Sequence, residues 1–119
     1  MSIATAKTKY VRVSPRKARL AGDMIRGKDA VEALLQLTYS NLKAGRLLKK
    51  TLVSAIANAE NNNDARREDL YISELRIDEG SHFKRSWPCK SRGRRALIIR
   101  RTSHFTIALD SIANRKKRK

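Results

Sequence analysis

The stretch 79–96 places the strongest constraint on the fold of this chain. It holds few side chains that could form a core, yet it lies between two strand-like segments, 70–78 and 96–109. A hairpin loop normally needs only about two to five residues. Because glycines are sparse and long side chains dominate, a flexible linker is a poor interpretation. We therefore expect both strands to continue past the sheet as an extended hairpin, with a reach on the order of 30 Å.

The extended hairpin is strongly cationic. Its bases are Lys84, Arg85, Lys90, Arg92, Arg94 and Arg95. They would repel one another along an isolated pair of strands, which is itself marginal in water. Phosphates on both sides would remove this repulsion, so the sequence predicts an element that takes its order from nucleic acid. A disordered basic loop is the alternative.

The net charge of +17 is unevenly distributed along the 119 residues. Residues 1–28 sum to +7, residues 29–81 to −2 and residues 82–119 to +12. A near-neutral centre between basic ends indicates a folded part with attachments that hold phosphates. No apolar run approaches the roughly 20 residues of a membrane span, and the single cysteine has no disulfide partner. We expect a cytoplasmic protein with no membrane partner.

The rest of the chain predicts an α+β fold in one domain, with a globular part at about 6–78 and 97–109 and a basic tail at 110–119. Strands are expected at 8–13, 70–78 and 96–109, and helices from Ser14 to a stop at Gly27, at 29–37 and at 41–60. One side of the antiparallel sheet is expected to be covered by helices. The residues 114–119 form a charge run that is expected to be disordered when free.

The helix and strand periodicities also predict which side chains form the core. Along the three helices these are Leu20, Ala21, Met24, Ile25, Val31, Leu34, Leu35, Ala44, Leu47, Leu48, Leu52, Ala55, Ile56 and Ala59. One face of the last strand carries Leu97, Ile99, Phe105, Ile107 and Leu109, and Tyr10 and Tyr71 are also expected in the sheet core.

Two features allow either a binding or a structural interpretation. Ser14, Arg16, Lys17 and Arg19 stand at a helix start, where free N–H groups favour a phosphate, although ordinary capping would explain the serine. Trp87 lies among polar neighbours and could stack on an unpaired base or pack against the partner strand.

Catalysis has no support in the sequence. Asp78 and Glu79 are adjacent, so on a strand their side chains diverge, and the phosphate-loop and nucleophile-elbow motifs are missing. His82, Cys89 and His104 follow no zinc-ligand spacing. We therefore predict no catalytic residue, no metal and no cofactor. Architectural DNA binding and a small ribonuclease are the competing functions.

Seven blocks of sequence, taken together, are specific. They are VRVSPRKARL (11–20), DMIRGK (23–28), SAIANAENN (54–62), DLY (69–71), DEG (78–80), KR (84–85) and RTSH (101–104). In this order and near this spacing the chain resembles the bacterial large-subunit ribosomal proteins of the L-twenty-two family, from about residue 6 to residue 109. The resemblance implies three helices packed on a small three-stranded antiparallel sheet, with a long protruding β-hairpin. It also implies a structural component of the large ribosomal subunit that binds its RNA, supports assembly and lines the peptide exit tunnel.

The resemblance and the basic pattern together name the site residues. The expected ribosomal RNA contacts are Lys9, Arg12, Ser14, Arg16, Lys17, Arg19, Lys84, Arg85, Lys90, Arg92, Arg94, Arg95, Arg100, Arg101 and His104. The resemblance implies a tunnel-lining tip formed by Trp87, Pro88, Cys89, Lys90, Ser91, Arg92 and Gly93. Departures from the family pattern concentrate near this tip, at Ser81, at Cys89–Lys90 and in one extra residue before Gly93. Expected partners are ribosomal RNA, neighbouring ribosomal proteins and the nascent peptide, without homo-oligomers.

Overall fold

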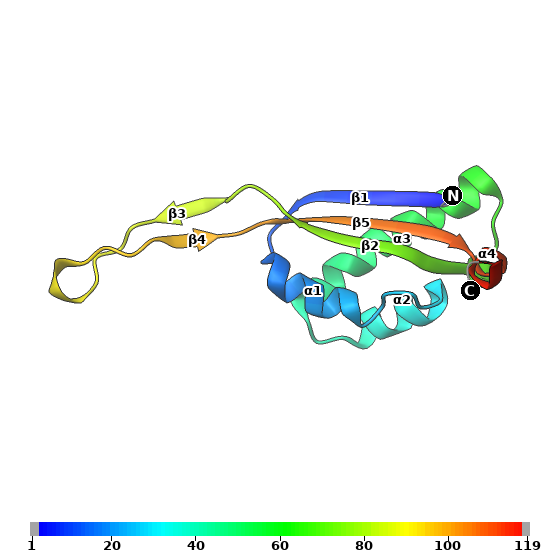
Figure 1. Ribbon diagram of the computed structural model, residues 1–119, viewed down its shortest axis with the longest axis horizontal. Helices are drawn as coiled ribbons and strands as arrows, with labels where there is room; N and C mark the ends of the chain where they lie inside the picture. The colour runs from blue at the N-terminus through cyan, green and yellow to red at the C-terminus, as the bar shows by residue number, and fades with distance from the viewer. Residues whose placement is uncertain (1–2, 118–119) are drawn as a thin grey trace.

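The computed structural model describes residues 3–117, and over this range the chain forms an α+β fold. Strand β5 (Ser103–Ser111) is the centre of an antiparallel sheet in the order β1-β5-β2, between β1 (Ala4–Val11) and β2 (Leu70–Glu79). Helices α1 (Pro15–Asp23), α2 (Ala30–Tyr39) and α3 (Lys43–Asn63) lie on one face of this sheet, and a short 3₁₀ turn (Arg67–Asp69) precedes β2 (Figure 1). The predicted fold class is confirmed. We call these strands and helices the body.

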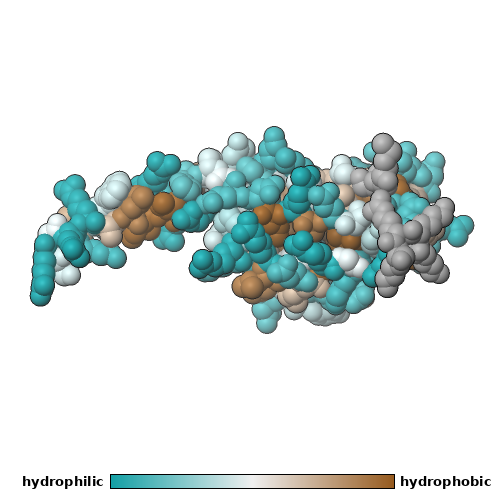
Figure 2. Space-filling view, viewed as in Figure 1, coloured by the Kyte–Doolittle hydropathy of each residue, from teal (hydrophilic) through white to brown (hydrophobic). Residues whose placement is uncertain are grey.

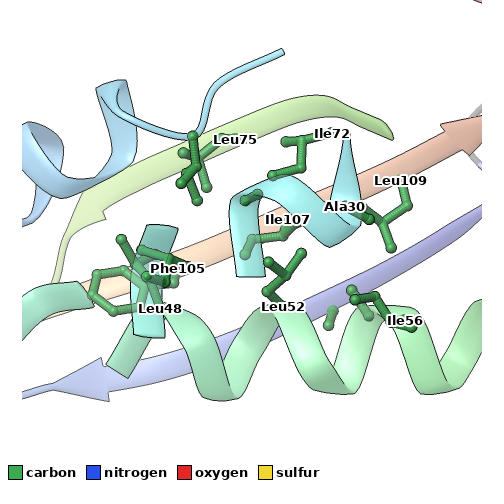
Figure 3. Close-up of a cluster of buried hydrophobic side chains, with 14 of the residues drawn as sticks. Ala30, Leu48, Leu52, Ile56, Ile72, Leu75, Phe105, Ile107 and Leu109 are labelled. Atoms are coloured by element: carbon green, nitrogen blue, oxygen red, sulfur yellow. The ribbon is translucent and has the colours of Figure 1, made fainter. Parts of the chain in front are cut away.

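The core of the body lies between α3 and the sheet. Phe105, Ile107 and Leu109 alternate along β5 and are fully buried. They meet Leu48 and Leu52, which recur on one face of α3 (Figure 3). This part of the predicted core is confirmed. The helix continues past its predicted end at residue 60 and stops where Asp64 adopts a left-handed conformation.

Helix α1 buries its small residues instead of its large ones. Leu20 is 63% exposed and Met24 is also exposed, so their predicted core positions are wrong. Ala18, Ala21 and Gly22 face the interior instead. A Cβ on Gly22 would lie 2.8 Å from Cδ1 of Ile77, too close for contact. The helix thus approaches the sheet through its smallest side chains, while Ile25 is buried as predicted.

Helix α2 shows the same correction. Val31 and Leu35 are exposed, and Leu34 is only partly buried against the core. Buried positions on this helix are Ala30, Ala33 and Leu37. On α2, Leu37 is thus the large aliphatic side chain that is buried, while Val31 and Leu35 face outward, which the apolar periodicity alone does not reveal.

Strand β1 begins earlier than predicted and ends in an irregularity. The pairing between β1 and β5 shifts register between Thr8 and Val11. At this bulge Tyr10 has a φ of 55° and is exposed, so its predicted place in the sheet core is wrong. Tyr71 on β2 is buried, as predicted.

Residues 80–102, which we call the arm, extend from the body between β2 and β5 (Figure 1). Strand β3 (Lys84–Ser86) pairs antiparallel with β4 (Ile98–Arg100), and a turn at Ser91–Gly93 joins their extensions. Leu97 and Ile99 lie in the arm, so their predicted place in the core is wrong; the strand breaks at residues 101–102 before β5 starts. The molecule extends 62 × 25 × 24 Å, and its radius of gyration of 17.4 Å exceeds the roughly 13.5 Å of a compact chain of this length.

The described residues of the C-terminus form a short helix, α4 (Ile112–Lys117), where the sequence predicts disorder for 114–119. Strand β5 continues to Ser111, and the buried Asp110 accepts hydrogen bonds from the Ser111 N–H and the Asn114 side chain. Arg115 lies 3.4 Å from Asp29 and above the Tyr71 ring. These contacts hold the first turn of the helix, whereas residues 118 and 119 of the predicted tail lie outside the described residues.

Candidate nucleic-acid interface

The arm presents its charge to solvent. It contains eight Lys or Arg residues and no Asp or Glu. Within 81–101, all of which the structure describes, no residue is buried. Hydrophilic side chains cover the far end of the arm in Figure 2. The predicted phosphate contacts at 84–85 and 90–95 are therefore all accessible, and their mutual repulsion favours an anionic environment.

The far end of the arm is a tight turn. Arg92 and Gly93 have φ values of 58° and 68°, and the Lys90 N–H donates to the Arg94 carbonyl at 2.6 Å. Two successive left-handed residues match the turn that closes right-twisted hairpins. Glycine adopts this conformation freely, whereas the arginine pays roughly 1–2 kcal/mol. The residues 87–93, which the resemblance places at a tunnel wall, form this end of the arm, and Trp87 is 60% exposed, so the partner strand does not cover it.

Hydrogen bonds tie the two chains of the arm together at its base, where they leave the body, and another joins β5 to the segment after β1. The Gly80 N–H donates to the Thr102 carbonyl at 2.9 Å, and the Thr102 hydroxyl donates to the Ser81 carbonyl at 2.6 Å. The buried Ser103 hydroxyl donates to the Val13 carbonyl at 2.6 Å. A Cβ on Gly80 would lie 2.5 Å from the Thr102 hydroxyl oxygen. The two chains of the arm thus leave the sheet closely packed, which sets the direction of the arm.

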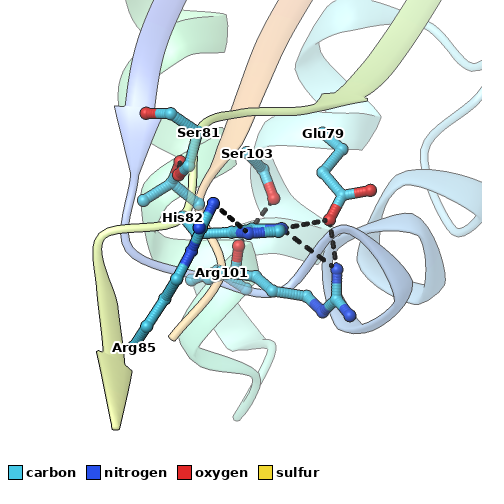
Figure 4. Close-up of polar contacts among 8 residues, drawn as sticks. Glu79, Ser81, His82, Arg85, Arg101 and Ser103 are labelled. Atoms are coloured by element: carbon cyan, nitrogen blue, oxygen red, sulfur yellow. Dashed lines mark hydrogen bonds and ion pairs between the residues drawn. The ribbon is translucent and has the colours of Figure 1, made fainter. Parts of the chain in front are cut away.

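A charged cluster adds to this base (Figure 4). Arg101 donates to Glu79, and the His82 ring lies 3.5 Å from the same carboxylate. Arg85 approaches the other ring nitrogen of His82 at 3.4 Å. The hydrogen bond from Arg101 lowers the pKa of Glu79 below its ordinary value. Arg101, a predicted RNA contact, is thus partly neutralised, while over residues 3–117 no ion pair involves Arg85.

Two aromatic contacts lie around the end of β1, one with the arm and one with β5. The Arg12 guanidinium lies 4.0 Å from the centre of the Phe83 ring. His104 accepts a hydrogen bond from the Tyr10 N–H at 3.0 Å and meets the Tyr10 ring edge-on at 4.8 Å. These contacts give His104 a structural role at the β1 bulge.

An open groove of about 1000 Å³ lies where the arm meets the body. Six of the predicted RNA contacts line it: Arg12, Ser14, Lys17, Lys84, Arg100 and Arg101. The first turns of α1 and α3 border it, which adds the positive ends of two helix dipoles. Sequence reasoning missed Lys43 and Phe83 in this lining. Lys43 could have been found, because it lies at the start of a predicted helix.

A smaller hollow of about 440 Å³ continues along the start of α1. Arg16 and Arg19 line it together with Ser14, Lys17, Glu79 and Arg101. Ser14 occupies the predicted N-cap position, but in the described structure its side chain makes no capping hydrogen bond. Arg19 donates to the Ile77 carbonyl at 3.2 Å. Lys9 lines neither hollow, and the cations at 90–95 lie at the other end of the arm.

The chain was compared with known proteins. Residues 6–110 match the family described as ribosomal protein L22p/L17e. The chain belongs to this family. It is 56% identical over 112 residues to the large ribosomal subunit protein uL22 of Protochlamydia amoebophila, covering 94% of this chain and 100% of that protein.

Two further relatives with the same name give similar values. The protein of Chlamydia trachomatis serovar L2b is 56% identical over 102 residues, covering 86% of this chain and 91% of its own. The protein of Petrotoga mobilis is 53% identical over 106 residues, covering 89% of this chain and 70% of that protein. The L22 family consists of ribosomal proteins and not of enzymes. Over residues 3–117, no helix has the length and apolar content needed to cross a bilayer.

Proposed function

We propose that this member of the L22 family is a structural component of the large ribosomal subunit. It binds large-subunit ribosomal RNA and neighbouring ribosomal proteins, and it supports their assembly. The single observation that carries the role of the arm is its composition: eight bases, no acid and no buried residue between 81 and 101. Such a segment gains little from its own packing and much from surrounding phosphates.

The contacts divide into two groups by position. Arg12, Lys17 and Arg100 line the groove where the arm meets the body, so the fold brings them together before RNA arrives. The cations at 90–95 lie at the far end of the arm, beyond the β3–β4 pairing. The first group suits recognition of a preformed RNA shape, and the second suits neutralisation of phosphates along a channel.

The tip at 87–93 lines the path of the nascent peptide in this proposal. The test is to place a photo-crosslinking amino acid at Trp87 in ribosomes stalled with a labelled nascent peptide. Tyr39 is the matched control, because it is an exposed aromatic residue on the body. We expect crosslinks to the peptide from position 87 and none from position 39. Peptide crosslinks of equal yield from both positions would contradict the role of the tip.

RNA binding is tested with a shortened arm. Residues 87–97 are replaced by Asn-Gly, which keeps the pairing of Ser86 with Ile98 and supplies a favoured two-residue turn. We expect a folded chain that cosediments with large subunits more weakly as salt rises. Unchanged retention at every salt concentration would contradict a role of the arm in RNA binding. The free chain is expected to be monomeric, with the 13.5 kDa mass of a single copy in light scattering, because self-association would bring two charges of +17 together.

A further inference from the structure

The groove at the base of the arm has an apolar floor. Val13, Leu20, Leu42, Ala44, Phe83 and Ile99 contribute to its lining. They come from separate parts of the chain: the segment between β1 and α1, helix α1, the start of α3, and both chains of the arm. Leu20, Leu42 and Phe83 are exposed. Leaving large apolar side chains together in water is unfavourable, so a surface of this kind indicates an occupant.

The rim of the same groove is cationic. Among the lining residues that the structure describes, the ionisable side chains are all basic: Arg12, Lys17, Lys43, Lys84, Arg100 and Arg101. Arg101 is paired with Glu79, whereas in the described part of the chain no ion pair involves the other five. The groove therefore presents unneutralised positive charge around an apolar surface.

An unpaired nucleotide matches both features. Its base is flat and apolar on its faces, and its flanking phosphates carry negative charge. Arg12 already lies on the Phe83 ring at 4.0 Å, and pairs of guanidinium and aromatic groups provide planes on which bases stack. The volume of about 1000 Å³ is that of a small-ligand cleft rather than of a large protein interface.

We propose that this groove holds one unpaired nucleotide of ribosomal RNA, with its base on the apolar floor beside Phe83 and its phosphates on Arg12, Lys17, Lys43 and Arg100. The inference rests on the proposed RNA-binding function and makes it more specific. Phe83 then contacts a base that is turned out of the RNA stack. The cations at 90–95 neutralise phosphates of the RNA backbone without contacting that base.

The first experiment isolates the base from its phosphates. Binding of the full chain is measured to a short RNA hairpin with one bulged adenosine, and to the same hairpin with an abasic ribose at the bulge. Both RNAs carry the same charge, so contacts to phosphate cancel. We expect the adenosine RNA to bind about ten-fold more tightly, as for a single stacked base.

Substitutions of aromatic residues test whether the preference for the adenosine RNA over the abasic RNA arises at Phe83. Phe83→Ala should bring the two affinities together, and Phe83→Tyr should retain the difference because it keeps a ring. Phe83 is half exposed on the arm, so the fold of the body should persist, as a thermal melt would verify. Trp87→Ala tests the competing assignment, in which the exposed aromatic at the tip stacks on the base; the groove assignment predicts that this variant keeps the preference.

The outcomes are distinct. No difference between the adenosine and abasic RNAs, or a difference that is lost in Trp87→Ala and kept in Phe83→Ala, would overturn the groove assignment while leaving RNA binding in place. Failure to bind either RNA would overturn the proposed function itself.

The second experiment identifies the occupant in the ribosome. A photo-crosslinking amino acid replaces Leu20, whose side chain lines the groove and is 63% exposed. In purified large subunits we expect an adduct with ribosomal RNA at one nucleotide. An adduct with another protein would show that a polypeptide fills the groove, and would overturn the proposal.

Discussion

The two phenylalanines of this chain occupy opposite environments. Phe105 is fully buried at the centre of the body, between α3 and the sheet. Phe83 stands on the arm, half exposed, with a guanidinium on its ring. The body is thus stabilised by apolar burial, whereas the arm has backbone pairing and cations but no core. One short chain thus combines a part that has its own apolar core with a segment that has none.

Removing each phenylalanine ring should affect stability very differently. Phe105→Ala should lower the free energy of unfolding by about 3–5 kcal/mol, because it leaves a cavity in the core. Phe83→Ala should change it by less than about 0.5 kcal/mol. Chemical denaturation followed by circular dichroism measures both. Similar losses of stability for the two variants would show that Phe83 is also part of a core, and would contradict this description.

The two glycines at the ends of the arm give the next effect. Gly80→Ala would push a methyl group to 2.5 Å from the Thr102 hydroxyl, so we expect about 1–3 kcal/mol of destabilisation of the body. Gly93→Ala strains only a left-handed turn at the tip, where a Cβ meets no atom within 4 Å. Its thermal midpoint should match that of the unchanged protein. A midpoint lowered equally by both substitutions would mean that arm and body unfold together.

RNA affinity should respond to the arm more than to the body. Arg94→Ala with Arg95→Ala removes two accessible cations, and the slope of log affinity against log salt should become shallower by roughly 1.5. The matched control is Arg26→Ala with Arg76→Ala, because each of these side chains already has a carboxylate partner, Asp23 or Glu74. Filter binding to ribosomal RNA over a salt series measures both slopes. Equal changes in the two pairs would contradict the special role of the arm.

The smallest effect concerns the junction between the two regions. Arg101 lowers the pKa of Glu79, so the folded state holds this carboxylate in its charged form. The stability contributed by the pair is present above the ordinary carboxyl pKa of about 4.5 and is lost as the pH falls through the lowered value. The small difference in denaturation midpoint between the unchanged protein and Glu79→Gln should therefore vanish in acid. A difference that grows as the pH falls would contradict this sign.

Much of the fold could be predicted from local pattern. The periodicity of Leu48, Leu52 and Ile56 and the alternation of Phe105 and Ile107 identify a helix and a strand that bury one face each. The errors have a common physical cause in α1 and α2. There small residues such as Gly22 face the interior, and large residues such as Leu20 face outward. Which residues are buried depends on how closely the helix approaches the neighbouring element, and local pattern does not contain that distance.

The candidate site was predictable as a set of cations but not as an arrangement. The charge pattern indicated the arm and the start of α1 as cationic segments. The resemblance to the L22 family added the expectation that the arm is a β-hairpin with a tip at the tunnel wall. Neither signal could indicate that Arg12 would lie on Phe83, or that Lys43 and Lys17 would line the same groove, because the two residues of each pair are distant in sequence. Arg101 was expected to contact RNA, yet the fold also gives it Glu79 as a partner.

Hydrogen exchange of backbone amides, measured on the free chain and on the large subunit, tests the division between body and arm most directly. In the free chain, amides of β5 and α3 should exchange slowly, near the rate of global unfolding, and those of β3 and β4 should exchange rapidly. In the subunit the arm should become protected. Slow exchange of β3 and β4 in the free chain, equal to that of β5, would show that the arm is stable without RNA and would contradict this account.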